Sequence, residues 1–394
     1  MAKEEISFES VLRNPVYKDR DMIYALNPPT GLLHRTDQKN ELVMELAPIL
    51  MNSAVSCIFV YGNPGTGKTS LVNELSEKLS QEATKNKVKL EKVYVNCSEN
   101  RSETTILIDL LSQLNPDKEY PRLGWNRSKA IEEFTKELDK RSSNLLVILD
   151  EVDYVLKESG DDILYRLSRV NEQNLKSKVS TIIISNDIRV SDYIKPRTQS
   201  AFGRVKVIFP PYGADDLEDI LKDRVELALK HGVCSEAVIK KIAEIEASRG
   251  GDARRALELL DSCAKISMAK GLSKISLEVV NEADSNLENN GVFNTIASLT
   301  KHQKILYLTM IKNQKKVMVG GDVYKEYLEM CKQYNIEPLT ERMIRSFFIN
   351  FTEVGLIKSE VGWLQSAKKK IRKITFNLDK ALMKKAEKLL RDTI

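Results

Sequence analysis

The stretch "VYGNPGTGKTSLVNEL" (residues 60–75) decides the fold, because it holds a phosphate-binding signature in the context that the signature requires. Residues 62–69 fit G-x-x-x-x-G-K-[ST], with an apolar strand pattern before them and an amphipathic helix pattern after them. Glycines in such a loop let backbone N–H groups surround a phosphate, Lys68 reaches the β- and γ-oxygens, and the Thr69 hydroxyl ligates Mg²⁺. The alternative is a glycine turn before an ordinary helix. The residues that the loop assigns to a nucleotide are Gly62, Asn63, Pro64, Gly65, Thr66, Gly67, Lys68, Thr69 and Ser70.

A second apolar run, "LLVILDEVD" (145–153), ends in carboxylates and supplies the acidic partner that such a loop needs. We expect Asp150 to hold Mg²⁺ through water and Glu151 to polarise an attacking water as general base. The run "TIIISND" (181–187) ends in Asn186, whose amide could orient that water, although asparagine is also a common turn residue.

Short β-branched runs recur between helical patterns and predict an α/β fold with a parallel sheet covered on both faces. They lie at residues 56–61, 92–97, 144–150, 179–185 and 204–209. "PPYGADDLEDIL" (210–221) then opens a helical stretch to about residue 285, and "SNLENNG" (285–291) has the composition of a polar connector. The pattern predicts a sheet domain at 1–211, a helical lid at 212–290 and a third domain at 291–394.

"RGGDARRALELL" (249–260) presents an electrostatic problem, because the helix begins at Asp252 and places two arginines in its first turn. Cations are disfavoured there by a few tenths of a kcal/mol, roughly, so a negative partner is expected. A γ-phosphate is such a partner if the helical domain covers the nucleotide, with Arg254 favoured over Arg255. Pairing of surface arginines with Asp252 or Glu258 is the alternative.

Charge is unevenly distributed along the chain. Residues 291–394 contain 20 Lys and Arg against 10 Asp and Glu, whereas residues 1–290 contain 41 against 46. The asymmetry favours a polyanion-binding domain at the end, and a lysine-rich solvated surface is the alternative. No apolar run approaches the ~20 residues of a membrane span, and the acidic start resembles no leader peptide. The cysteines form no CxxC pair, so we expect reduced thiols in a cytoplasmic protein. Binding to DNA would make that protein nucleoid-associated.

The basic domain shows three helical patterns, at 300–313, 321–334 and 340–355, followed by a hairpin pattern at 356–376. Three helices and a basic hairpin predict a winged helix, with the third helix in the major groove of double-stranded DNA and the wing on phosphates. In that helix Met343, Phe347, Phe351 and Val354 are expected to share one apolar stripe, with Ile344 and Phe348 beside it. The DNA-binding residues predicted here are Arg342, Arg345 and Ser346 on the helix, and Lys368, Lys369, Lys370, Arg372 and Lys373 in the hairpin loop. A protein-docking winged helix is the alternative.

Taken in this order, "GNPGTGKT", "LDEVDYV", "IIISND", "VIFPPYGADDLEDIL" and "RGGDARRALELL" resemble AAA+ ATPases, and most closely the archaeal replication initiators related to the eukaryotic origin recognition complex and cell-division-cycle loader proteins. "NPPTGLLHR" (27–35) resembles that family's adenine-side segment, which assigns Leu33, His34 and Arg35 to the nucleotide, together with Tyr212. The resemblance implies ATP or ADP as the nucleotide, Asn186 as sensor 1, Arg254 as sensor 2 and 212–285 as the lid.

The resemblance also implies an arginine finger near "KPRTQSAFGR" (195–204) that reaches a neighbouring subunit's ATP. Arg197 is our choice and Arg204 the reserve, although this chain has Lys195 where the family tends to have an acidic residue. Residues 98–134 lie where initiators insert a DNA-contacting motif, so Arg122, Gly124, Trp125 and Arg127 are candidates for the sugar-phosphate backbone. An ordinary surface connection with a packed tryptophan is the alternative.

These observations predict a replication initiator that binds origin DNA, uses ATP and ADP as a switch with slow hydrolysis, and helps to recruit the replicative helicase, with related initiator subunits as further partners. Two rival functions are a clamp-loader-type subunit, which would need no basic winged helix, and a nucleotide-regulated transcription factor, which would be found at promoters.

Overall fold

A computed structural model gives the structure of the chain and describes residues 16–25, 28–55, 57–121, 124–173, 175–201, 205–313, 317–364, 369–376, 378 and 380–394. The chain divides into two compact units, Met1–Val280 and Asn281–Ile394. In the described ranges, no helix combines the length and the apolar character that crossing a membrane would need.

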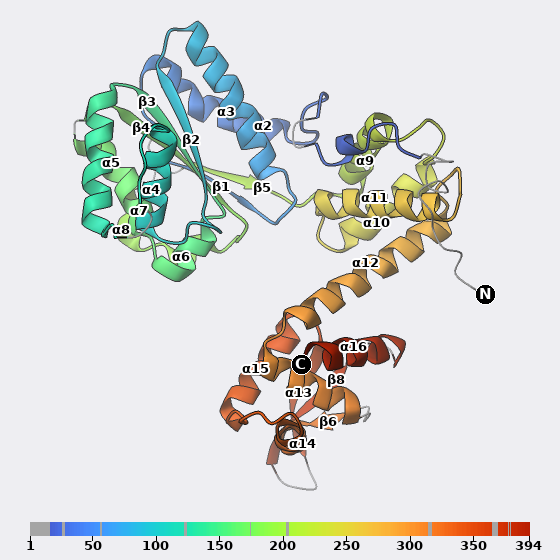
Figure 1. Cartoon of the computed structure of the whole chain (residues 1–394). Helices are drawn as coiled ribbons and strands as arrows, with labels where there is room; N and C mark the ends of the chain where they lie inside the picture. The colour runs from blue at the N-terminus through green and yellow to red at the C-terminus, as the bar shows by residue number, and fades with distance from the viewer. Residues whose placement is uncertain are drawn as a thin grey trace. The chain divides into compact units, whose positions relative to one another are not determined.

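The first unit contains a five-stranded parallel sheet with the strand order β2-β3-β4-β1-β5 (Figure 1). The strands are β1 (Ile58–Gly62), β2 (Leu90–Asn96), β3 (Asn144–Asp150), β4 (Lys178–Ser185) and β5 (Val205–Phe209). Each coincides with one of the β-branched runs, so the predicted parallel sheet is confirmed. Because β1 pairs with both β4 and β5, the phosphate-binding loop leaves the sheet between two neighbours.

Helices cover both faces of the sheet, as its nearly continuous apolar strands require. One face packs on α2 (Thr36–Leu46), η2 (Ala47–Met51) and α3 (Lys68–Lys85). The other packs on α4 (Glu103–Leu114), α5 (Arg127–Arg141), α6 (Asp153–Ser159), α7 (Asp162–Arg169), η3 (Val170–Gln173), η4 (Val190–Tyr193) and α8 (Pro196–Ala201) (Figure 1). Alternate strand residues face the two cores, with Val60 in the first and Phe59 in the second.

The lid consists of α9 (Ala214–Ala228), α10 (Glu236–Ser248) and α11 (Ala253–Ala269). The predicted start of α11 is confirmed, because the Asp252 carboxylate caps the helix by accepting hydrogen bonds from the backbone N–H groups of Arg254 (2.8 Å) and Arg255 (3.3 Å). α12 (Leu277–Ser298) follows.

Residues 16–25, which we call the N-terminal strap, include η1 (Arg20–Ile23) and dock on the lid. The buried Asp261 carboxylate of α11 accepts hydrogen bonds from Tyr17 (2.7 Å), Arg20 (3.1 Å) and Tyr24 (3.2 Å). Burial opposes ionisation of Asp261, yet the hydrogen bonds around it lower its pKa to about 2. The strap is therefore fastened to the lid by a carboxylate that stays charged.

The second unit is a winged helix, as predicted. It contains α13 (Lys301–Asn313), β6 (Met318–Val319), α14 (Gly320–Gln333), α15 (Glu341–Glu353), β7 (Ile357–Leu364), β8 (Lys369–Phe376) and α16 (Lys380–Thr393). Its antiparallel sheet has the order β6-β8-β7. The core of the unit contains Tyr307, Tyr327 and Phe351, all fully buried.

Three sequence predictions are wrong in detail: those for residues 285–291, for helix α15 and for the basic hairpin. Residues 285–291 are helical, inside α12, which runs from the first unit into the second, so the connector is a helix and not a loop. Polar residues also suit an exposed helix, and one glycine costs only about 1 kcal/mol. In α15 the buried stripe is Ile344, Phe348 and Phe351, while Met343 and Val354 are exposed. The helix offers two adjacent apolar stripes, and its neighbours in the core select one of them.

The basic residues of the hairpin are also placed differently. Lys369, Lys370, Arg372 and Lys373 belong to strand β8 and not to a loop, because the ladder from Ile357↔Phe376 continues to Leu364↔Lys369. Lys368 lies outside the described residues.

Candidate functional site

The phosphate-binding loop joins the end of β1 to the start of α3, and close neighbours require two of its glycines: Asp252 of the lid and Leu32, which precedes α2. A Cβ on Gly65 would lie 1.6 Å from Asp252 Oδ1, and one on Gly67 would lie 2.9 Å from Leu32 Cδ2. The Ala253 N–H donates to the Gly65 carbonyl oxygen at 3.2 Å. The start of α11 therefore rests directly on the loop, as the sequence predicted for a lid that covers a nucleotide.

Lys68 is buried, and its ammonium donates to the carbonyl oxygens of Gly62 (2.9 Å) and Asn63 (2.7 Å). Burial lowers its pKa to about 8, the nearby Asp150 carboxylate opposes this shift, and the Arg254 guanidinium adds to it. The ammonium is thus held inside the loop, where it can exchange carbonyl partners for phosphate oxygens.

The two predicted metal ligands lie in contact. The Thr69 hydroxyl donates to Asp150 Oδ2 at 2.8 Å, and the Tyr94 hydroxyl donates to the same oxygen at 2.9 Å. A hydroxyl beside a carboxylate is an all-oxygen donor set, which suits Mg²⁺ when phosphates supply the remaining ligands. The adjacent Glu151 has a backbone φ of +54°, an unusual conformation for a residue other than glycine.

Asn186 follows β4, the neighbour of β3 in the sheet, so it lies at the same edge as Asp150 and Glu151. Its backbone N–H donates to Asp153 Oδ1 at 3.2 Å, and its side chain is half-buried. The structure therefore brings the predicted base and the predicted sensor to one end of the sheet.

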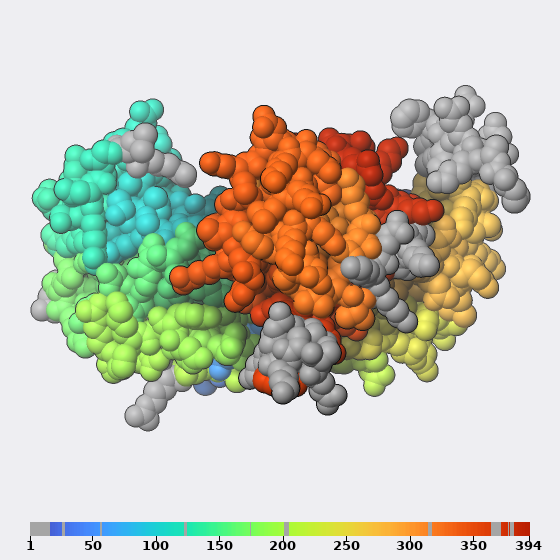
Figure 2. All heavy atoms as spheres, turned by 90° about the horizontal axis from the view of Figure 1, so that it is seen from below, coloured from blue at the N-terminus to red at the C-terminus, as the bar shows by residue number. Residues whose placement is uncertain are grey.

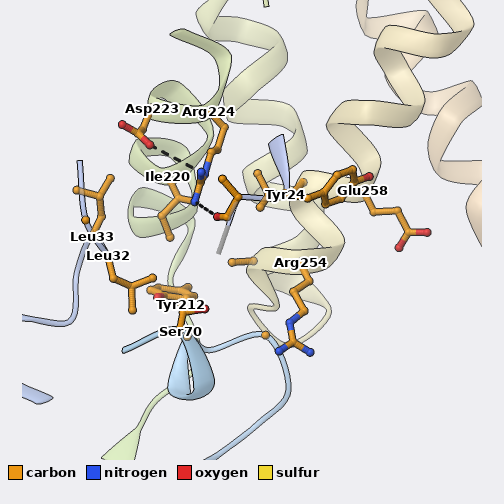
Figure 3. A pocket seen from close by; sticks show the side chains of 16 residues that line it. Tyr24, Leu32, Leu33, Ser70, Tyr212, Ile220, Asp223, Arg224, Arg254 and Glu258 are labelled. Atoms are coloured by element: carbon orange, nitrogen blue, oxygen red, sulfur yellow. Dashed lines mark hydrogen bonds and ion pairs between the residues drawn. The ribbon is translucent and has the colours of Figure 1, made fainter. Parts of the chain in front are cut away.

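A cavity of about 460 Å³ lies between the loop, the lid and the N-terminal strap (Figure 3). Figure 3 shows Leu32 and Leu33 on one side and Arg254 on the other, with the Arg254 side chain directed toward the loop. The predicted residues that line the cavity are Leu33, Gly65, Gly67, Ser70, Tyr212 and Arg254. Gly31, Leu32 and Ala253 also line it and belong to predicted segments, 27–35 and the start of α11. Sequence reasoning missed Tyr24, Ala25, Ile220, Asp223, Arg224, Leu257 and Glu258. The apolar spacing of the lid helices was the signal that could have identified Ile220 and Leu257.

The two arginines of α11 have different surroundings. Arg255 pairs with the buried Glu246 carboxylate, with Nε 3.4 Å from Oε2. In the described part of the chain no carboxylate pairs with Arg254, which lines the cavity. This difference supports Arg254 as the residue that faces a γ-phosphate.

Arg35 and His34 do not line the cavity. Arg35 is buried, donates to the carbonyl oxygens of Thr66 (2.9 Å) and Pro210 (2.8 Å), and stacks 3.7 Å from the centre of the Tyr212 ring. It ties the phosphate-binding loop to the joint between sheet and lid. His34 lies beside the carboxylates of Asp216 and Asp219, at 3.2 and 3.0 Å. Arg35 therefore contacts one residue of the cavity wall, Tyr212, whereas the two partners of His34 do not line the cavity.

The candidate arginine finger and some of the candidate DNA-contacting residues in the insertion make contacts within the chain. Arg197 pairs with Asp162 (2.8 Å), and so does Arg127 (3.1 Å). Trp125 packs edge-on against Tyr120 with ring centres 5.7 Å apart, as in the alternative of a packed tryptophan. Gly124 is exposed, with a φ of +87°. Arg122 and Arg204 lie outside the described residues.

In the second unit the predicted helix residues face solvent. Arg342 is exposed, Arg345 pairs with Glu341 at 2.8 Å, and the Ser346 hydroxyl donates to the Met343 carbonyl oxygen at 2.6 Å. Arg372 donates to Ser359 Oγ at 2.9 Å and, with Arg345, lines a cavity between α15 and the wing. The structure thus places predicted residues of the helix and of the hairpin around one groove.

Three protein-family models match the chain: an AAA domain at residues 51–187, a Cdc6 AAA+ ATPase-type lid domain at residues 218–285, and a CDC6 C-terminal winged helix domain at residues 294–386. ORC1-type DNA replication protein 1 of Sulfolobus acidocaldarius is 36% identical to the chain over 348 residues, which cover 88% of this chain and 86% of that protein. The ORC1-type DNA replication protein of Thermococcus onnurineus is 33% identical over 360 residues, 90% of this chain and 87% of that protein.

Solved structures show the same architecture. The Aeropyrum pernix ORC1 protein, solved in complex with DNA, is 27% identical with a TM-score of 0.84, covering 96% of this chain and 97% of that one. The Aeropyrum pernix ORC2 protein, solved as ADPNP–ADP complexes, is 22% identical with a TM-score of 0.60, covering 96% and 99%, and shares the fold.

Proposed function

The chain belongs to the family of ORC1-type DNA replication proteins and has their AAA+ ATPase domain, and from this premise we propose that it binds origin duplex DNA and uses ATP and ADP as a switch. The observation that carries the switch is the contact between the start of α11 and the phosphate-binding loop, at Ala253 and Gly65. Phosphates that enter the loop meet α11 directly, so the nucleotide state changes the position of the lid. Helicase recruitment and assembly with related initiator subunits belong to the same proposal.

Residues of the phosphate-binding loop, of the adjacent edge of the sheet and of α11 divide the chemistry among them. Lys68 and Arg254 neutralise phosphate charge, Glu151 accepts a proton from the attacking water, and Asn186 orients that water. Mg²⁺ held by Thr69 and Asp150 supplies charge stabilisation at the phosphates. We infer slow hydrolysis, because a switch depends on the lifetime of each state. We assign nucleotide binding to residues 1–211, the lid to 212–290 and DNA binding to 291–394.

DNA binding is tested by charge neutralisation on the wing. The triple change Lys368→Gln, Lys369→Gln and Lys370→Gln is expected to weaken binding to every duplex alike and to flatten the plot of log affinity against log salt by about 0.9 per lost phosphate contact. The matched control is Lys384→Gln, Lys385→Gln and Lys388→Gln on α16, which removes the same charge from exposed positions of the same unit. Equal salt slopes for the two variants, measured by fluorescence anisotropy, would contradict the proposed role of the wing.

Base readout is tested separately at Arg342, which is exposed on α15. Arg342→Gln is expected to cost about 1–3 kcal/mol on the preferred duplex and little on a random one, because a base contact carries sequence information and a phosphate contact does not. A genomic footprint identifies the preferred duplex. A uniform loss on both duplexes would show that Arg342 contacts phosphate only.

The pKa of Lys68 predicts how nucleotide affinity depends on pH. Before a nucleotide binds, burial holds this pKa at about 8, and bound phosphates raise it. Below pH 8 the lysine is already charged, so its contribution to affinity is constant. As the pH rises through 8, binding must take up a proton, so affinity falls by up to about tenfold per pH unit.

Calorimetry at pH 8 in two buffers of different ionisation enthalpy measures this proton uptake. Lys68→Arg is the control, because a guanidinium stays protonated throughout. Constant affinity of the unmodified chain from pH 7 to about pH 9.5 would contradict the linkage.

A further inference from the structure

Asp162, the first residue of α7, uses both carboxylate oxygens to hold two arginines from different helices. Its Oδ1 accepts from Arg197 Nη2 of α8 at 2.8 Å, and its Oδ2 lies 3.1 Å from Arg127 Nη2 of α5. Figure 1 shows α5, α7 and α8 together on one flank of the sheet. One carboxylate therefore joins the candidate arginine finger to the candidate DNA-contacting insertion.

Neighbouring residues anchor α7, the helix that carries Asp162. The preceding Asp161 is fully buried and anchors the finger segment to α7 by accepting from the Lys195 backbone N–H at 2.8 Å. Arg127 also contacts Glu103, with Nε 2.5 Å from Oε2, and Arg166 donates to the other oxygen of Glu103 at 2.6 Å. The helix that carries Asp162 is thus held in place from both sides.

Both arginines remain accessible to an outside anion. The side chains of Arg127 and Arg197 are 52% and 54% exposed, whereas that of Asp162 is 29% exposed. Green atoms from this part of the sheet domain reach the surface in Figure 2. Half-exposed ion pairs are weak, so phosphate oxygens from a ligand can compete with Asp162 for either guanidinium.

We propose that Asp162 is a positioning residue that couples a DNA phosphate contact made by Arg127 to a nucleotide phosphate contact that Arg197 makes on a second copy of this chain. This coupling rests on the proposed function. Two cations share one carboxylate, so when either leaves for a phosphate, Asp162 holds the remaining one more strongly. The two contacts therefore weaken each other. When Arg197 contacts a nucleotide phosphate, Asp162 holds Arg127 away from DNA, and when Arg127 contacts a DNA phosphate, Asp162 holds Arg197 away from the nucleotide.

The first test measures duplex binding of the full chain by anisotropy across a salt series. Asp162→Asn removes one of the two carboxylates that compete for Arg127 and leaves Glu103 in place, so DNA affinity rises about threefold, in the range expected for a half-exposed ion pair. The salt slope steepens by up to about 0.9, one phosphate contact. Asp162→Glu keeps the carboxylate and behaves as the unmodified chain, which a general loss of structure would not allow.

A double-mutant cycle separates coupling from a structural effect. In an Arg127→Gln background, Asp162→Asn leaves DNA affinity unchanged, because its effect passes through Arg127. Arg197→Gln weakens DNA binding about twofold when Asp162 is present, and has no effect in the Asp162→Asn background. Thermal unfolding of each variant confirms that the comparison is made between folded proteins.

Two results would overturn the proposal while leaving the proposed function intact: unchanged DNA affinity and salt slope in Asp162→Asn, or an effect of Asp162→Asn that persists without Arg127. Failure of the unmodified chain to bind duplex DNA at modest salt would instead remove the proposed function itself.

Discussion

Replacing Gly251 with alanine is expected to lower the free energy of unfolding of the first unit by about 3 kcal/mol and to weaken nucleotide binding at least tenfold. A Cβ at this position would lie 2.3 Å from the Tyr212 carbonyl oxygen and 2.8 Å from its nitrogen, and backbone atoms cannot move aside cheaply. The strain of a non-glycine residue at φ +67° adds about 1–2 kcal/mol. Since Tyr212 and the neighbouring Asp252 contact the loop, displacing this backbone moves the walls of the cavity.

Gly271→Ala is the matched control for this prediction. Gly271 lies at the other end of α11 with a φ of +66°, and nothing lies within 4 Å of the position its Cβ would take. The control therefore carries the same backbone strain, about 1–2 kcal/mol, without the collision. Thermal unfolding and a nucleotide titration measure both variants. If the two variants lost the same stability and the same nucleotide affinity, a side chain at position 251 would not collide with the backbone of Tyr212.

The second large effect is expected at Arg254. Arg254→Gln should weaken ATP binding about tenfold to a hundredfold, because a charge-assisted hydrogen bond is worth about 1.5–3 kcal/mol, while ADP binding changes less than about threefold. The physical basis is that Arg254 faces the loop from α11 and pairs with no carboxylate in the described residues, and we propose a γ-phosphate as its negative partner.

Arg255→Gln provides the comparison, because it removes the same charge from the same turn of the same helix. Its guanidinium already has a partner in Glu246, so ATP affinity should change less than about twofold. The test is a titration of both variants with ATP and with ADP. If ADP affinity fell as far as ATP affinity in Arg254→Gln, the arginine would contact a phosphate other than the γ-phosphate.

The sheet and the phosphate-binding loop could be predicted because their signals are local. A β-branched run of five to eight residues predicts a strand without reference to the rest of the chain, and the loop signature fixes which strand carries it. The helix start at Asp252 was predictable for the same reason, since the cap and the residues that it holds are two and three positions apart.

Features that depend on contacts between distant segments could not be predicted. Nothing in residues 16–25 indicates that they form a wall of the cavity, because their partners lie on the lid. The nucleotide contact of Arg35 stays a prediction, but its contacts with Thr66, Pro210 and Tyr212 exist only because the folded chain brings these residues together. Packing against neighbouring elements also decides which face of α15 is buried: Ile344 is buried, whereas Met343 is exposed.

The attachment of the strap to the lid has a consequence for the order of events on the ribosome. Tyr17, Arg20 and Tyr24 have their common partner at Asp261, which is 237 to 244 positions later in the chain. Segments synthesised first must therefore wait until nearly the whole first unit has been translated before they can dock. Closing so long a loop is entropically costly and slow, so completion of this wall is expected to be a late step of folding.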